Sequence, residues 1–159
     1  MSEETSTYVV RKLVHDDRDV WTELFRSYAE FYERTLGDDE LEVVWRWIFE
    51  DELIVALVVT LADSTDEPVG LAHLREWIRP LRASVNGYLD DLFVALDHRG
   101  TGAVDELFAA IIALARQRHW PLVRWTTATD NFRAQSVYNK YAMRTSWVTY
   151  DLTVTDVGR

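Results

Sequence analysis

A turn with two glycines, placed between an apolar run and a longer periodic run, constrains this chain more than any other feature. The run YLDDLFVAL (88–96) is typical of a buried strand. It is followed by DHRGTGAVDELFAAI, in which apolar residues recur at helical spacing, and we expect a helix of roughly 18 residues that stops near Pro121. A glycine costs about 1 kcal/mol in a helix interior. Gly100 and Gly102 therefore indicate a backbone that bends, or approaches a ligand, just before the helix.

The rest of the chain alternates between strand and helix patterns. We expect one domain over residues 1–159 with an α/β fold, in which helices flank a mixed central sheet. The other predicted strands are 7–13, 53–61, 69–78, 122–128 and 144–154, with 53–61 and 69–78 forming a hairpin. The other predicted helices run from Asp16 or Asp17 to Gly37, over 38–51 and within 130–141, and RPLRASVNG (79–87) is expected to be irregular.

Charge and composition limit the partners. The 17 Lys and Arg residues against 27 Asp and Glu residues leave a net charge of −10, which disfavours nucleic acid and anionic membranes and favours cationic ligands or simple solubility. There are no cysteines, and the four histidines lack metal-ligand spacing, so we expect no metal site. The start MSEETSTYVV does not have the pattern of a signal peptide, and the apolar run 53–62 is too short for a membrane span. These features predict a cytoplasmic protein.

The glycine turn has the ingredients of an anion site. The first N–H groups of a helix lack intrahelical partners, and the helix dipole places partial positive charge there. Glycines let the backbone approach a pyrophosphate, and Arg99 adds a permanent cation. The turn matches neither the P-loop nor the dinucleotide-binding glycine motif. On these residues alone, an ordinary loop before an amphipathic helix is an equal alternative.

Two motifs together give the turn a more specific interpretation. The segment YLDDLFVALDHRGTGAV is followed about 30 residues later by NFRAQSVYNKY. This pair resembles the GNAT N-acetyltransferase superfamily, in which Arg/Gln-x-x-Gly-x-Gly/Ala opens one helix and Asn-x-x-Ala-x-x-x-Tyr lies on a later one. Chain length, YLDDLFV and the early YAEFYE look most like the diamine and polyamine (spermidine/spermine-type) N-acetyltransferases.

The resemblance implies acetyl-CoA as co-substrate, with no metal. The backbone of Leu92, Phe93 and Val94 is then expected to pair with the pantetheine amides. The diphosphate would bind the turn formed by Arg99, Gly100, Thr101, Gly102, Ala103 and Val104. Asn131 either contacts the cofactor or caps its helix, and Lys140 is a candidate for a CoA phosphate. The chain departs from the family at Val104, where glycine or alanine is usual.

Two residues are candidates for the chemistry. An alkylammonium has a pKa near 10.4, so it must lose a proton before it attacks a thioester. By its position in LDDLFV, Asp90 is expected to hold the amine or accept that proton. Strand alternation predicts that Asp90 and Asp91 lie on opposite faces of the sheet. The family match makes Tyr138 the general acid for the departing thiolate, and the histidines are given no role.

The acceptor is expected to be a small cationic amine bound by the first two helices. Tyr28, Glu30 and Glu33 are the favoured contacts, because carboxylates and aromatic faces both suit an alkylammonium. Relatives imply a homodimer. Two alternatives remain at this point: acetylation of another amine, such as an antibiotic, an amino acid or a protein N-terminus, and a non-catalytic binding or regulatory protein with the same fold.

Overall fold

Among the described residues, five strands form one mixed sheet in the order β1-β2-β3-β4-β5. The computed structural model describes residues 7–155. β1 to β4 pair antiparallel, whereas β4 and β5 pair parallel. The strands are β1 (Tyr8–Lys12), β2 (Val55–Leu61), β3 (Ser64–Arg79), β4 (Ser84–Val94) and β5 (Val123–Arg124). The expected hairpin between β2 and β3 and the mixed α/β architecture are confirmed.

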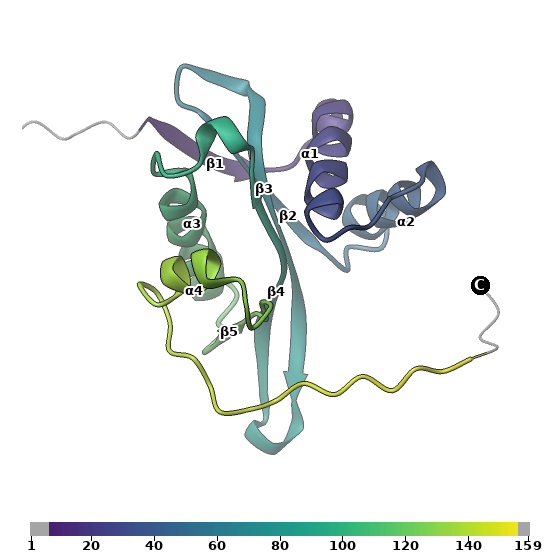
Figure 1. Cartoon of the computed structure of the whole chain (residues 1–159), viewed down its shortest axis with the longest axis vertical. Coiled ribbons are helices and arrows are strands. Elements are labelled where there is room, and N and C mark those ends of the chain that lie inside the picture. Colours follow the sequence, from purple (N-terminus) through teal and green to yellow (C-terminus); the bar gives the residue numbers. More distant parts are fainter. Residues whose placement is uncertain (1–6, 156–159) are drawn as a thin grey trace, which may run out of the picture. The chain divides into compact units, whose positions relative to one another are not determined.

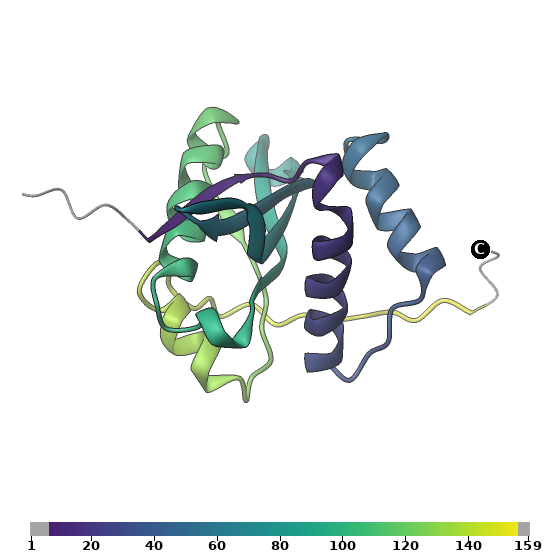
Figure 2. The same cartoon turned by 90° about the horizontal axis from the view of Figure 1, so that it is seen from above.

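Helices cover both faces of this sheet. α1 (Arg18–Phe31) and α2 (Asp38–Phe49) lie on one side, and α3 (Ala103–Gln117) lies on the other. Figures 1 and 2 show this arrangement from two directions. Each helix buries an apolar stripe, which is the reason that an amphipathic helix packs against a sheet. α1 contacts β3 and β4, so the strand that carries the two aspartates also supports the first helix.

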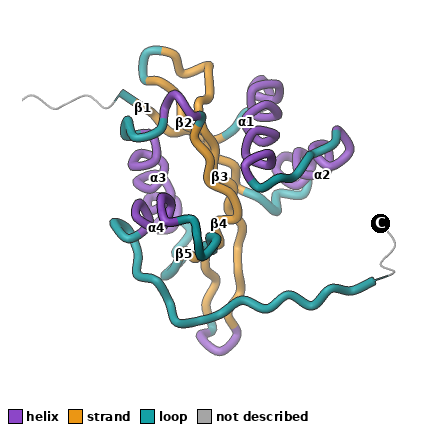
Figure 3. The backbone as a smooth tube through the Cα atoms, viewed as in Figure 1, coloured by secondary structure: helices purple, strands orange, loops and turns teal. Residues whose placement is uncertain are grey.

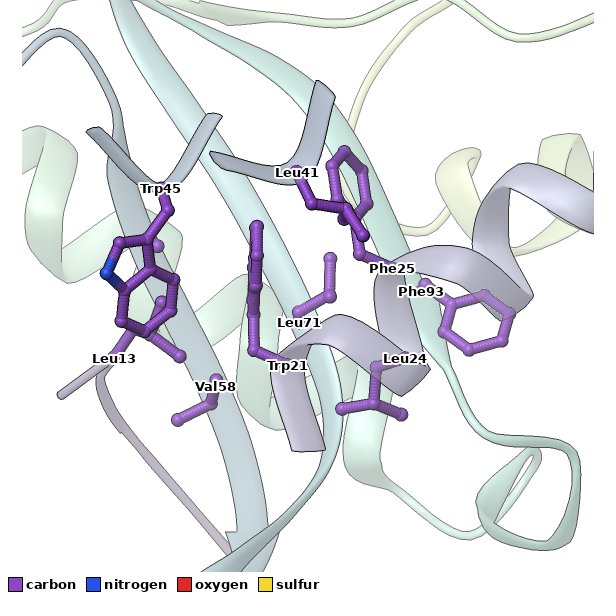
Figure 4. Packing of buried hydrophobic residues seen from close by; sticks show 10 residues of the cluster. Leu13, Trp21, Leu24, Phe25, Leu41, Trp45, Val58, Leu71 and Phe93 are labelled. Atoms are coloured by element: carbon purple, nitrogen blue, oxygen red, sulfur yellow. The ribbon is translucent and has the colours of Figure 1, made fainter. Parts of the chain in front are cut away.

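An aromatic cluster fills the space between α1, α2 and the sheet. Trp21 is fully buried, and its ring lies 5.1 Å from Trp45 and 5.4 Å from Phe25. Figure 4 shows these rings packed together with Leu71 of β3 and Phe93 of β4. Buried aromatic side chains contribute large apolar areas, so this cluster anchors α1 and α2 to the sheet.

Two helices end earlier than the sequence predicts. α1 stops at Phe31 rather than at Gly37, and Glu33 has a left-handed φ of 56°. α3 stops at Gln117, before Pro121, because His119 has φ 56° and Trp120 N–H donates to the Ala115 carbonyl at 2.8 Å. This is a left-handed helix end of the kind that asparagine or glycine usually forms.

Two strand boundaries are also corrected. Most of 79–87 is regular, since β3 and β4 extend to meet at η2 (Pro80–Arg82) and Ala83 turns with φ 46°. The predicted strand 122–128 is longer than the observed strand β5, whose two residues pair only with Gly87 and Tyr88.

By its internal contacts the chain divides into two units after Thr126. In the second unit, α4 (Phe132–Tyr138) agrees with the predicted short helix. The predicted strand 144–154 is wrong: this segment is a loop without strand pairing among the described residues, as Figure 3 shows. Its alternating large side chains Val148, Tyr150 and Leu152 are exposed. A strand requires a partner edge, and an alternating pattern by itself does not supply one.

Candidate active site

A β-bulge brings Asp90 and Asp91 to the same face of the sheet. In the register with β3, His73 lies opposite Asp91 and Leu74 lies opposite Leu89. Asp90 is therefore an extra residue of β4 that has no residue opposite it on β3. Asp91 contacts His73 and Asp90 contacts Arg75. His73 and Arg75 are two residues apart on one strand and share a face. The predicted placement of the two aspartates on opposite faces is therefore wrong.

Asp90 forms an ion pair at this bulge. Arg75 Nε lies 2.9 Å from Asp90 Oδ2 and 3.2 Å from Oδ1, and the Arg75 guanidinium lies over the Tyr88 ring at 4.6 Å. Burial nevertheless raises the pKa of Asp90 above its ordinary value, because desolvation outweighs the charge and hydrogen bond of Arg75, and the neighbouring Asp91 charge acts in the same direction as burial. The Asp90 carboxylate is thus a better proton acceptor than an ordinary surface aspartate.

Asp91 ends a buried chain of hydrogen bonds. Trp21 Nε1 donates to His73 Nε2 at 3.0 Å, and His73 Nδ1 lies 2.9 Å from Asp91 Oδ2. The His73 side chain is 1% exposed and that of Asp91 is 24% exposed. Sequence reasoning gave His73 no role. The available signal was one histidine inside the apolar run VGLAHL, since a buried polar side chain requires hydrogen-bond partners.

The glycine turn adopts the bent backbone that its sequence predicts. Gly100 has φ 74° and Gly102 has φ 102°, and a Cβ at either position would meet no atom within 4 Å. The space beside both glycines is therefore open. α3 begins at Ala103, and Glu106 N–H donates to the Gly102 carbonyl, so the N–H groups of Ala103 and Val104 belong to the first helical turn, where a ligand can be the acceptor. Val104 is half-buried.

Two side chains of the turn hold it against the sheet. Arg99 Nε donates to the Val94 carbonyl at 2.8 Å, and its guanidinium lies 5.3 Å from the centre of the Phe93 ring. Thr101 Oγ1 donates to the His98 carbonyl at 2.7 Å and lies 2.7 Å from the Tyr8 hydroxyl of β1. The turn is thereby tied to the end of β4 and to β1.

Leu92, Phe93 and Val94 lie on the part of β4 beyond its pairing with β5. They pair with β3 on one edge, and β5 reaches only Gly87 and Tyr88 on the other. Of the described residues, none forms a strand beside this outer edge after Tyr88. An extended ligand with amide groups is the type of molecule that pairs with such an edge.

The expected acceptor contacts on α1 differ in their placement. Tyr28 is half-buried, and its ring lies 5.9 Å from Phe93 of β4 and 5.2 Å from Tyr32. Glu30 lies exposed near the end of the helix, and Glu33 follows it, also exposed. The structure thus brings Tyr28 against β4, whereas the two glutamates face solvent.

The other predicted residues belong to the second unit. Asn131 caps α4, since its side-chain oxygen accepts a hydrogen bond from Ala134 N–H at 3.2 Å. Tyr138 is the last residue of α4 and is half-buried, and Lys140 is exposed. The capping alternative for Asn131 is therefore observed, and the cofactor alternative stays a prediction.

Residues 7–155 contain neither a membrane-spanning helix nor a cluster of metal-ligating side chains. None of their helices is long and apolar enough to cross a membrane. Nor do they contain a group of three or more His, Asp or Glu side chains that could hold a metal ion.

Comparison with known proteins relates the whole arrangement to acetyltransferases. Residues 21–143 match the family model described as Acetyltransferase (GNAT) family. The chain is 23% identical over 142 residues to the D-amino-acid N-acetyltransferase HPA3 of Saccharomyces cerevisiae (strain ATCC 204508 / S288c), with 89% of this chain and 88% of HPA3 covered.

Solved structures share the fold. A crystal structure of a probable acetyltransferase aligns with a TM-score of 0.81 at 24% identity, covering 94% of this chain and 99% of that one. AAC(6')-Iy in complex with the bisubstrate analogue CoA-S-monomethyl-acetylneamine aligns with a TM-score of 0.79 at 16% identity, with 94% and 99% covered. At these identities the likeness concerns the fold.

Proposed function

Because the chain belongs to the acetyltransferase (GNAT) family and is an acyltransferase that uses acetyl-CoA, we propose that it acetylates a primary amine of a small cationic acceptor, a polyamine or a diamine. The observation that carries this proposal is the pair of aspartates at the bulge of β4, next to an open strand edge and the glycine turn. The family match favours an enzyme over a non-catalytic binding protein with the same fold.

The residues around the turn fit acetyl-CoA, which supplies a thioester carbonyl for attack by the amine. The outer edge of β4 at Leu92 to Val94 offers backbone groups to the pantetheine amides. The N–H groups of Ala103 and Val104 at the start of α3 offer donors to a diphosphate, and the open space beside Gly100 and Gly102 leaves room for it. Arg99 adds positive charge there, and Lys140 is the proposed contact for a further phosphate.

Asp90 is the proposed proton acceptor. The ammonium group of an alkylamine holds its proton with a pKa near 10.4, so a carboxylate of ordinary acidity is a poorly matched base. The desolvation that raises the pKa of Asp90 narrows this mismatch. Tyr138 is the proposed acid for the leaving thiolate, because a thiol with a pKa near 8.5 and a phenol with a pKa near 10 exchange a proton with little mismatch.

A second candidate acceptor is an amino acid. The relative HPA3 is named for D-amino acids, whose carboxylate requires a cation that a diamine does not require. Arg75 is the cation beside Asp90, and its side chain is 44% exposed. Arg75 would therefore serve an amino acid acceptor and would only neutralise Asp90 when the acceptor is a polyamine.

An acetylation screen separates these acceptors. The purified protein is incubated with acetyl-CoA and spermidine, spermine, putrescine, thialysine, an aminoglycoside or D-amino acids, and release of free CoA is measured. The proposal expects kcat/KM to be highest for the polyamines or diamines. Preference for D-amino acids would establish the second candidate, and turnover of none of these amines would contradict both.

The proposed assembly is a cytoplasmic homodimer. Support comes from exposed apolar side chains of the second unit, which a second copy would bury: Met143, Trp147, Val148, Tyr150, Leu152 and Val154. The absence of cysteines fits a reducing compartment. Sedimentation velocity of the full chain and of Trp147→Ser tests the dimer, which the substitution should weaken.

A further inference from the structure

We propose that Trp21 and His73 form a buried positioning relay that holds the Asp91 carboxylate as the anionic contact for the ammonium group of the acceptor. This inference rests on the proposed function and deepens it, because it assigns recognition of the cation to Asp91 and leaves Asp90 as the proton acceptor. Trp21 and His73 are then positioning residues, which act through Asp91 without touching the acceptor.

The hydrogen bonds allow one neutral tautomer of His73. An indole nitrogen is a donor only, so Trp21 Nε1–H requires a bare, accepting Nε2 on His73 at their separation of 3.0 Å. The proton of the neutral imidazole therefore resides on Nδ1. Nδ1–H points at Asp91 Oδ2, 2.9 Å away, and donates to it. A proton on Nε2 would place two donors against each other in the core.

Burial makes this relay rigid. Trp21 and His73 are both fully buried, and their rings pack against Phe25, at 5.4 Å and 4.9 Å. Figure 4 shows the surroundings of Trp21 in this cluster. Asp91, by contrast, is 24% exposed, so the relay runs from the core to a carboxylate that solvent reaches. Pre-organisation of a binding group by buried neighbours lowers the entropy lost on binding.

The balance of charge identifies Asp91 as the carboxylate that attracts a cation. Arg75 already neutralises Asp90 at 2.9 Å. Within residues 7–155, the structure pairs Asp91 with no Lys or Arg, and its partner His73 is neutral in the tautomer that Trp21 imposes. The four side chains Arg75, Asp90, His73 and Asp91 therefore carry one net negative charge, which complements one ammonium group.

The tautomer is tested directly by NMR. Full-length protein labelled with 15N-histidine is examined at pH 7, and the nitrogen shifts of His73 are assigned by comparison with His73→Gln. The relay expects a protonated Nδ1 and a bare Nε2. A proton on Nε2, or on both nitrogens, would overturn it. This measurement requires neither acetyl-CoA nor an acceptor, so it is independent of the proposed function.

The role of Asp91 as the contact for the ammonium group is tested with propylammonium as the probe. Titration of the labelled protein should shift the His73 Nδ1 resonance and saturate, whereas propionate should have no effect. Asp91→Asn should weaken the apparent affinity at least tenfold. The double variant Asp90→Asn/Arg75→Gln removes the ion pair and keeps one net negative charge, so its affinity should stay within about threefold. If the double variant abolishes binding and Asp91→Asn does not, Asp90 is the residue that binds the ammonium group and the inference is wrong.

The relay is tested through KM. His73→Leu removes both hydrogen bonds, and the KM for the best acceptor of the screen should rise about tenfold with little change in kcat. His73→Gln can still accept a hydrogen bond from Trp21 and donate one to Asp91, so its KM should lie close to that of the wild type.

In the Asp91→Asn background, His73→Leu should cause no further rise in KM, because the relay acts only through Asp91. Additive effects, or a fall in kcat alone, would contradict the relay even where the screen supports the proposed function. If His73→Leu does not fold, the propylammonium titration decides.

Discussion

Arg75 and Asp90 form an ion pair across the bulge of β4, with Arg75 Nε 2.9 Å from Asp90 Oδ2. Arg75 lowers the pKa of Asp90 against the larger, opposing effect of burial. Replacing Arg75 by a neutral residue should therefore raise that pKa further. The ion pair with Arg75 of β3 thus lowers the pKa of the proposed base, Asp90, and also holds its carboxylate in place.

Arg75→Met should move the acidic limb of the pH profile to higher pH. Asp90 accepts a proton only when it is ionised, so kcat/KM falls as the pH drops through its pKa. That limb should lie above the ordinary aspartate pKa in the wild type and higher still in the variant. The control is Arg79→Met on the same strand, whose guanidinium lies over Trp77 at 5.3 Å. If the acidic limb of the kcat/KM profile does not move in Arg75→Met, Asp90 is not the proton acceptor.

Asp17→Asn should destabilise the fold in a pH-dependent way. Burial opposes ionisation of Asp17, but two hydrogen bonds from Arg11 at 2.7 and 2.8 Å, one from Val14 N–H and the Arg11 charge together lower its pKa. A lowered pKa contributes stability above the unfolded value near 3.8, and this is lost as the pH falls through the folded value. At pH 7 the variant should lose about 2 kcal/mol of unfolding free energy.

Urea unfolding at pH 7 and near pH 3 measures this difference. The gap between wild type and Asp17→Asn should narrow at the lower pH. The control is Glu42→Gln, because Glu42 pairs with Arg18 where both side chains are largely exposed, at 60% and 42%. That substitution should change stability by less than about 1 kcal/mol. A gap of equal size at both values of pH would show that the Asp17 charge is not what stabilises the fold.

The local parts of the candidate site could be predicted from sequence, and the long-range parts could not. The glycine turn, the start of α3 and the cap at Asn131 depend on neighbouring residues, which a motif records. The bulge at Asp90 depends on pairing with β3, so strand alternation alone gave the wrong face. The role of His73 cannot be predicted from local sequence, because its partner Trp21 is 52 residues away in the chain.

Gly100→Ala should lower stability through backbone strain alone. Gly100 has φ 74°, and no atom lies within 4 Å of an added Cβ, so a steric clash is excluded. An alanine in the left-handed region costs about 1–2 kcal/mol. Gly100→Asn should lose less stability than Gly100→Ala, because asparagine tolerates the left-handed conformation better. Equal losses for the two variants in urea unfolding would contradict this explanation.

The same variants test the turn as the CoA site. CoA at 100 times its Kd should stabilise the wild type by about 2.7 kcal/mol in a thermal-shift titration. Gly100→Asn adds a side chain to the open space beside the turn, so it should weaken CoA binding more than its small effect on stability suggests. CoA that stabilises neither protein at millimolar concentration would place the cofactor elsewhere.

Tyr138→Phe should lower kcat and leave CoA affinity nearly unchanged. The substitution removes one hydroxyl at the end of α4 and keeps the ring, so the packing of this half-buried residue is preserved. Loss of a general acid lowers the rate by about 10²-fold or more. Tyr141→Phe, three residues further along, is the control and should keep kcat within about threefold. If Tyr138→Phe turns over like the wild type, another group or water protonates the thiolate, and Tyr138 serves only to pack its unit.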